Sequence, residues 1–206
     1  MHRKHKFLLL LPLVLVLAAC ATGSGTNDAG ANPGENAAAL PGVTEPAEAP
    51  LRLTSLAFAD GENIPQKYVC TRQGGENVSP ALVWENVPAE AASLALLVHD
   101  PHPTAQDWVH WVVADISPQR SGLPEGVPVG TAVSPDVLPG GATQYVNRSG
   151  SAGYAGPCPP DPPHPYVFTL YALRAAPAWE DGMTYAQLRD ALEGLVITSA
   201  SLTGQY

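Results

Sequence analysis

The side chains best suited to chemistry lie at or near the ends of three apolar segments, residues 93–100, 108–116 and 166–173. They are a carboxylate, two imidazoles and a phenol: Asp100, His110, His164 and Tyr166. Imidazoles, a hydroxyl and nearby backbone N–H groups all donate hydrogen bonds, so together they suit a small anion such as phosphate. Asp100 would hold one histidine in a single tautomer and raise its pKa, which favours a cationic site near neutral pH.

The same residues leave other chemistries open. Histidine and aspartate also ligate zinc, but the sequence lacks the tight ligand pairs of known metal motifs, so we predict no metal site. A hydrolase would use Asp100 and the histidines with Ser79 or Ser149 as nucleophile, although neither serine lies in a Gly-x-Ser-x-Gly elbow. In the plainest alternative, the imidazoles only satisfy backbone carbonyls at strand ends.

Short apolar runs bounded by glycine, proline, asparagine and aspartate must position these side chains. This pattern, with little helical periodicity, predicts a mainly β domain. Strands are expected over residues 51–58, 81–87, 93–100, 108–116, 166–173 and 196–206. The side-chain period of two places His110 on one face with Val112, Ala114 and Ile116.

One helix is expected near the C-terminus. Thr184 and Gln187 have the spacing of a capping box, and the apolar residues that follow fall on one helical face. By contrast, residues 117–156 are rich in glycine, proline and serine without a clear period, which indicates a long loop. If exposed, that loop is the candidate contact of a protein-interaction module, such as a protease inhibitor.

Residues 156–168 read GPCPPDPPHPYVF, a proline-rich approach to one of the expected strands. Proline fixes φ and lacks a backbone N–H, so residues 157–165 are expected to form neither helix nor central strand. We expect a stiff loop that delivers His164 to the strand that follows.

The first residues resemble an export signal. A basic start, MHRKHK, precedes the apolar stretch FLLLLPLVLVLAA, and Leu17-Ala-Ala-Cys20 resembles the lipobox of bacterial lipoproteins. We therefore expect a signal peptide over 1–19, a lipidated Cys20, and attachment to the extracytoplasmic side of the cell membrane. Ordinary signal cleavage with an incidental cysteine is the alternative.

Composition divides the rest of the chain. Residues 20–50 carry almost no large apolar side chains and are expected to form a disordered tether, which leaves 51–206 as the folded domain. The net charge is −9, and no run of lysine or arginine follows the signal. This balance argues against nucleic-acid binding and against electrostatic adhesion to anionic lipid, so membrane attachment should depend on the acyl anchor.

The two cysteines of the domain, Cys70 and Cys158, allow a single pairing. Disulfides persist in exported proteins, so we expect these residues to form one. Two buried free thiols are the alternative.

Several motifs follow one another along 51–206. They are YVC (68–70), ENVSP (76–80), LLVHDP (96–101), WVHWVV (108–113), GYAGPCPP (153–160), HPYVF (164–168) and SLTGQY (201–206). In type, order and spacing they resemble the motifs of phosphatidylethanolamine-binding proteins, in particular the bacterial Raf-kinase-inhibitor-like branch. The resemblance covers nearly all of the expected domain.

The resemblance implies a β-sandwich with a large antiparallel sheet, a smaller sheet and a C-terminal helix. It also implies a small anion-binding pocket formed by Asp100, His110, His164 and Tyr166 and walled by Pro157, Pro159 and Pro160. A non-catalytic binding protein without a cofactor is expected, with a phosphorylated ligand such as a phospholipid head group.

The sequence departs from the family pattern at the rim of this pocket. His102 replaces the second acid of the family's DPDAP motif, and Pro165 replaces the arginine of its HRY motif. Both changes alter charge, so the ligand preference of this chain can differ from that of its relatives.

Overall fold

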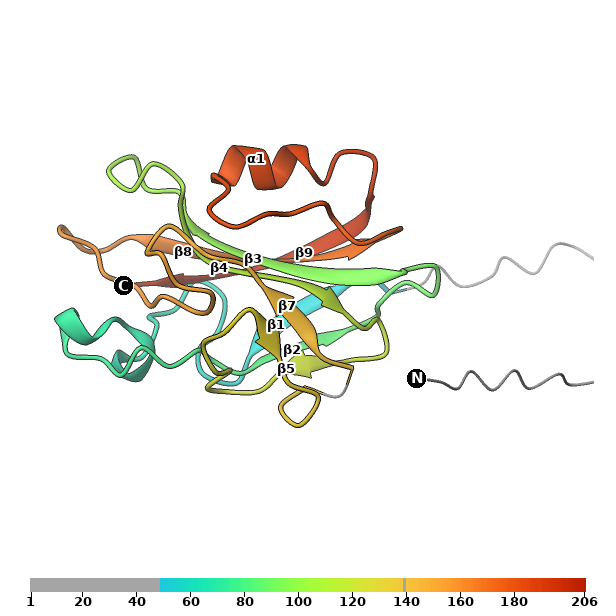
Figure 1. The fold of residues 1–206 in the computed structure, drawn as a ribbon. Coiled ribbons are helices and arrows are strands. Elements are labelled where there is room, and N and C mark those ends of the chain that lie inside the picture. The colour runs from blue at the N-terminus through green and yellow to red at the C-terminus, as the bar shows by residue number, and fades with distance from the viewer. Residues whose placement is uncertain (1–48, 139) are drawn as a thin grey trace, which may run out of the picture. The chain divides into compact units, whose positions relative to one another are not determined.

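The computed structural model describes residues 49–138 and 140–206, which fold around two antiparallel sheets (Figure 1). The strands of the larger sheet are Ser93–Asp100 (β3), Trp108–Ile116 (β4), Ala132–Val133 (β6), Ala142–Gln144 (β7), Pro165–Leu173 (β8) and Val196–Gln205 (β9). Their spatial order is β6-β7-β4-β3-β8-β9. The smaller sheet contains Arg52–Ser55 (β1), Leu82–Glu85 (β2) and Gly122–Leu123 (β5), in the order β1-β2-β5.

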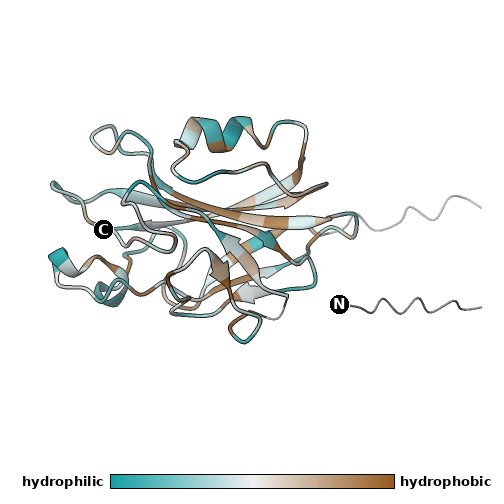
Figure 2. Cartoon of the chain, in the orientation of Figure 1, coloured by the Kyte–Doolittle hydropathy of each residue, from teal (hydrophilic) through white to brown (hydrophobic). Residues whose placement is uncertain are grey.

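Apolar side chains pack on both faces of the larger sheet. Leu96 and Phe168 belong to the core between the two sheets, whereas Leu97 packs with Leu188 of helix α1 (Tyr185–Asp190) on the other face. Because both faces of β3 are covered, every residue of this strand is buried, which explains its continuous apolar run. Figure 2 shows hydrophobic residues concentrated along the strands that form this core.

Helix α1 lies across the outer face of the larger sheet (Figure 1). Its capping box is present: the Gln187 N–H donates to Thr184 Oγ1, and the Thr184 N–H donates to Gln187 Oε1 at 2.9 Å. The helix has only 6 residues, so its stability depends on packing rather than on helical propensity. Leu188 and Leu192 supply that packing against Trp179.

The sequence-based fold class is confirmed: the domain is mainly β, with a large sheet, a small sheet and a C-terminal helix. The expected strands 93–100 and 108–116 have the bounds of β3 and β4. The description of 117–156 as one long loop was wrong, because this segment contains β5, β6 and β7. These strands have only 2 or 3 residues each, too few to show a period of two.

The expected face of His110 was also wrong with respect to Val112 and Ala114, because a β-bulge interrupts β4. Val109 pairs with His99 and Trp111 pairs with Val98, so His110 has no partner across the ladder. A bulge of this kind brings two successive side chains to the same side of the sheet. Accordingly, Trp111 packs between the sheets whereas Val112 packs toward α1.

Predictions for the N-terminal part, namely the signal peptide over 1–19, the lipidated Cys20 and the tether over 20–50, lie outside the described residues. Within 49–138 and 140–206, no helix combines the length and apolar character needed to cross a membrane.

The sulfur atoms of Cys70 and Cys158 are bonded in the structure, with 5.5 Å between the two Cα atoms. The bond joins residues that are 88 positions apart in the sequence. A cross-link over such a distance removes much of the conformational entropy of the unfolded chain.

We therefore expect the double variant Cys70→Ala, Cys158→Ala to lower the free energy of unfolding by roughly 4 kcal/mol. Urea denaturation of oxidised wild type and variant measures this difference. Wild type treated with a reductant is the matched control and should unfold at the denaturant concentration of the variant. Equal midpoints for oxidised wild type and variant would contradict the expectation.

Candidate ligand-binding pocket

A pocket of about 570 Å³ lies where β3 ends and where β4 and β8 begin. Four of its lining residues are those singled out from the sequence: Asp100, His110, His164 and Tyr166. Pro159 and Pro160 also line it, whereas Pro157 does not. The structure therefore brings together six of the seven residues expected at the site.

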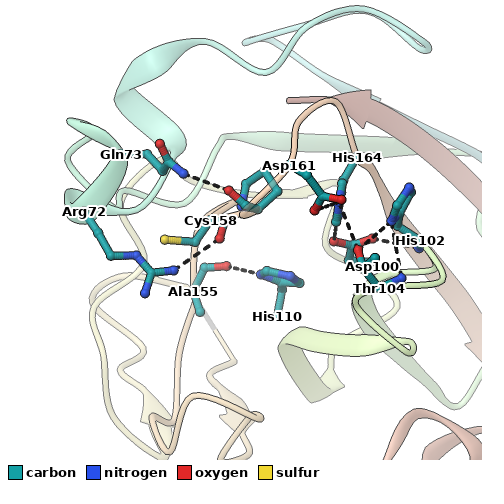
Figure 3. Close-up of polar contacts among 11 residues, drawn as sticks. Arg72, Gln73, Asp100, His102, Thr104, His110, Ala155, Cys158, Asp161 and His164 are labelled. Carbon is teal, nitrogen blue, oxygen red and sulfur yellow. Dashed lines mark hydrogen bonds and ion pairs between the residues drawn. The ribbon is translucent and has the colours of Figure 1, made fainter.

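The buried pair of Asp100 and His164 forms one side of the pocket (Figure 3). His164 Nδ1 donates to Asp100 Oδ2 at 2.7 Å, and both residues are almost fully buried. The second carboxylate oxygen, Asp100 Oδ1, accepts the backbone N–H of His102 at 2.8 Å. Both carboxylate oxygens are therefore bound by donors, as burial of a charged group requires.

The ring of His102 stacks on that of His164, with 3.8 Å between the ring centroids. Thr104 Oγ1 lies 2.8 Å from His102 Nδ1 and 3.4 Å from His164 Nε2. His102, one of the sequence departures from the family, therefore lies directly against the buried pair, where it can change what the pair binds.

His110 is held as a neutral ring. Its Nδ1 donates to the carbonyl oxygen of Ala155 at 2.7 Å, which leaves Nε2 as an acceptor. Burial lowers the pKa of His110 to about 4, and the opposing effects of the Ala155 carbonyl and of Asp100 are smaller. Asp100 does act to raise the pKa of His110, but burial outweighs this effect, so His110 is not cationic near neutral pH.

Tyr166 lies edge-on to His110, with 5.1 Å between the ring centroids. Burial raises the pKa of Tyr166 well above its usual value, so the hydroxyl remains protonated and can donate. The pocket thus contains a phenol that donates and an imidazole that accepts, in addition to the pair of Asp100 and His164.

The wall opposite the buried pair comes from two segments joined by the disulfide. Arg72 Nη2 donates to the carbonyl oxygen of Cys158 at 3.3 Å, and Gln73 Nε2 donates to that of Pro159 at 2.8 Å. Pro157 lies behind this wall, where its carbonyl oxygen accepts the N–H of Cys70 at 3.0 Å. Figure 3 shows Arg72 and the buried pair on either side of His110.

Gly156 permits the close approach of these two segments. A Cβ atom at this position would lie 2.4 Å from the carbonyl oxygen of Tyr68, closer than van der Waals contact allows. The N–H of Gly156 donates instead to Asn77 Oδ1 at 2.8 Å. The second glycine of the GYAGPCPP motif is therefore required by the shape of the pocket wall.

The serines considered as nucleophiles differ in position. Ser79 is buried outside the pocket lining, where its Oγ accepts the N–H of Val127. Ser149 lines the pocket, and its Oγ donates to Asn147 Oδ1. The hydroxyl that approaches His164 is instead that of Thr104.

Sequence reasoning missed Arg72, Thr104 and Asn147. Asn147 is buried, and its Nδ2 donates to the carbonyl oxygens of His110 and Gly153, which fixes the loop that carries Ser149. Arg72 lies in a 3-10 helix of 3 residues (Thr71–Gln73) and Thr104 lies in an irregular segment, so no hydrophobic period marks either residue. Proximity to the YVC and HDP motifs was the available signal.

No group of three or more histidine, cysteine, aspartate or glutamate side chains suited to a metal ion occurs among residues 49–138 and 140–206.

A family model for phosphatidylethanolamine-binding proteins matches residues 54–206. The chain belongs to this family. A UPF0098 protein of Methanothermobacter thermautotrophicus is 43% identical over 156 residues, which cover 76% of this chain and 98% of the relative. A Mycobacterium tuberculosis protein named "Putative lipoprotein LppC" is 34% identical over 209 residues, which cover 100% of this chain and 97% of the relative.

Solved structures of the phosphatidylethanolamine-binding protein family have the same fold. YbcL of Escherichia coli, described as a member of the mammalian family, has a TM-score of 0.67 at 33% identity and covers 77% of this chain and 98% of its own. A Chlamydia trachomatis homologue has a TM-score of 0.63 at 40% identity, with coverages of 76% and 97%. The family indicated by the motifs is thus confirmed.

The low pKa of His110 predicts a dependence of stability on pH. The unfolded chain protonates this side chain near pH 6.5, whereas the folded chain does so near pH 4. Between these values the unfolded state binds more protons, so the contribution of His110 is complete above pH 6.5 and is lost as the pH falls toward 4.

We expect this loss to amount to about 3 kcal/mol. Urea denaturation of wild type and His110→Asn at several pH values measures it, because asparagine can still donate to Ala155 but does not titrate. The free energy of unfolding of wild type should fall more steeply on acidification than that of the variant. Parallel pH profiles would show that His110 is not held neutral by burial.

Proposed function

We propose that this member of the family is a lipid-anchored binding protein on the extracytoplasmic side of the cell membrane. Its pocket binds a small anionic or phosphorylated group, such as a phospholipid head group, and does not convert it. The observation that carries this proposal is the pocket itself, in which the Asp100–His164 pair and the Arg72 guanidinium lie on opposite sides of the cavity. The mycobacterial relative named as a lipoprotein supports the anchor.

Arg72 supplies the positive charge for an anion. Among the described residues that line the pocket, it is the only arginine or lysine. His110 is neutral at physiological pH, and Asp100 offsets charge on His164. Within the described part of the chain the guanidinium makes one bond, to the carbonyl oxygen of Cys158, and it retains further N–H donors for phosphate oxygens.

We expect Arg72→Gln to weaken binding of phosphorylethanolamine by at least about tenfold, since a charge-assisted hydrogen bond contributes about 1.5–3 kcal/mol. Calorimetric titration of the full chain, kept in detergent, measures the affinity. Arg174→Gln is the matched control, because it removes the same charge from an exposed residue outside the pocket lining.

Three ligands separate the possible sources of the phosphoryl group. Inorganic phosphate tests the charge alone, phosphorylethanolamine tests the head group, and vesicles with and without phosphatidylethanolamine test the intact lipid. Saturable binding that is lost in His164→Asn supports the proposal. If none of the three binds to wild type, the anion-pocket proposal is wrong and a protein-interaction module becomes the better hypothesis.

Hydrolysis is a second candidate, favoured by one contact. Thr104 Oγ1 lies 3.4 Å from His164 Nε2, and His164 Nδ1 is bound to Asp100, which is the order of a nucleophile, a base and an orienting acid. Turnover of a chromogenic ester or phosphoester by wild type, abolished in Thr104→Val, would establish this activity. The non-catalytic proposal instead expects equal background rates for both proteins.

A further inference from the structure

His164 has one ring nitrogen with which to bind a ligand. Nδ1 is bound to Asp100 at 2.7 Å, so Nε2 is the atom left for an incoming anion. That atom already has a neighbouring anion, because Asp161 Oδ1 lies 3.3 Å from it. A carboxylate of the chain therefore lies in contact with the atom to which the anionic group of a ligand would bind.

The exposures of the two side chains indicate which of them can move. The side chain of His164 is 1% exposed, whereas that of Asp161 is 58% exposed. Asp161 is thus not fixed by packing. Among the described residues, its carboxylate contacts His164 alone. Rotation about its side-chain torsions would move the carboxylate into solvent without disturbing the core.

The backbone around Asp161 explains why the carboxylate lies at this position. Two prolines precede it and two follow it, Pro159, Pro160, Pro162 and Pro163. Proline restricts both its own φ and the conformation of the preceding residue, so the loop keeps the Cα of Asp161 close to His164. The side chain is therefore presented to His164 at a high effective concentration.

We propose that Asp161 is an internal substitute for the ligand: its carboxylate occupies the anion position at His164 Nε2 and must leave when a phosphorylated ligand binds. This inference rests on the proposed anion-binding function. A carboxylate and a phosphate both accept hydrogen bonds, so they compete for the Nε2–H of His164, which donates when both ring nitrogens are protonated. Asp161 therefore lowers the affinity for weak anions and favours ligands that carry more negative charge.

The test compares Asp161→Asn with Asp136→Asn by calorimetric titration of the full chain with inorganic phosphate at constant ionic strength. Both variants lose one negative charge from an exposed side chain outside the pocket lining, but of the two only Asp161 contacts His164. Asp161→Asn should bind phosphate about fivefold more tightly than wild type, since an ion pair with an exposed partner contributes up to about 1 kcal/mol. Asp136→Asn should bind as wild type does.

A second variant tests occupancy of the same position. In Asp161→Ala the carboxylate is absent, so acetate should bind and should compete with phosphate, whereas wild type should bind acetate at least fivefold more weakly. In this experiment acetate takes the place of the missing Asp161 carboxylate. If Asp161 had a purely structural role, acetate would not bind in its place.

The outcomes separate this inference from the proposed function. If wild type binds phosphate and Asp161→Asn binds it equally or more weakly, Asp161 does not compete with the ligand and only this inference falls. If neither wild type nor any variant binds phosphate or acetate, both the inference and the anion-pocket proposal fall.

Discussion

The contact between Asp100 and His164 is the constraint on which the pocket depends. It joins the last residue of β3 to the residue before β8, with 2.7 Å between the bonded atoms and almost no exposure of either side chain. A carboxylate buried to this extent is strongly destabilising unless donors surround it. The imidazole and the N–H of His102 are those donors, so the path of the chain after β3 is fixed by the need to satisfy Asp100.

Much of the site depends on departures from regular structure around this contact. The bulge in β4 brings His110 to the side of the sheet that carries Trp111, where it meets Tyr166. Gly156 and the disulfide bring the opposite wall close enough for Arg72 to reach the carbonyl oxygen of Cys158. The regular strands position the backbone, and the irregular positions determine how the side chains of the site are oriented.

This division explains how much the sequence could predict. The long strands were predicted because burial on both faces produces apolar runs, and the chemical residues were found because they lie at the ends of those strands. The face of His110 could not be predicted, because the bulge depends on the register with β3 and not on local composition. Arg72 was missed for a related reason: it lies in a 3-10 helix of 3 residues next to the disulfide, which is too short to show a hydrophobic period.

The position of the disulfide links the shape of the pocket to the redox state of its surroundings. Cys70 and Cys158 themselves line the cavity, so the bond is part of the pocket surface as well as a cross-link that stabilises the fold. In a reducing compartment thiols remain free, and the two segments of this wall would be joined by noncovalent contacts alone. Copies of the chain in a reducing compartment would therefore lack the covalent link between the two segments of the pocket wall. Under the proposed function, oxidation after export would complete this wall of the binding site.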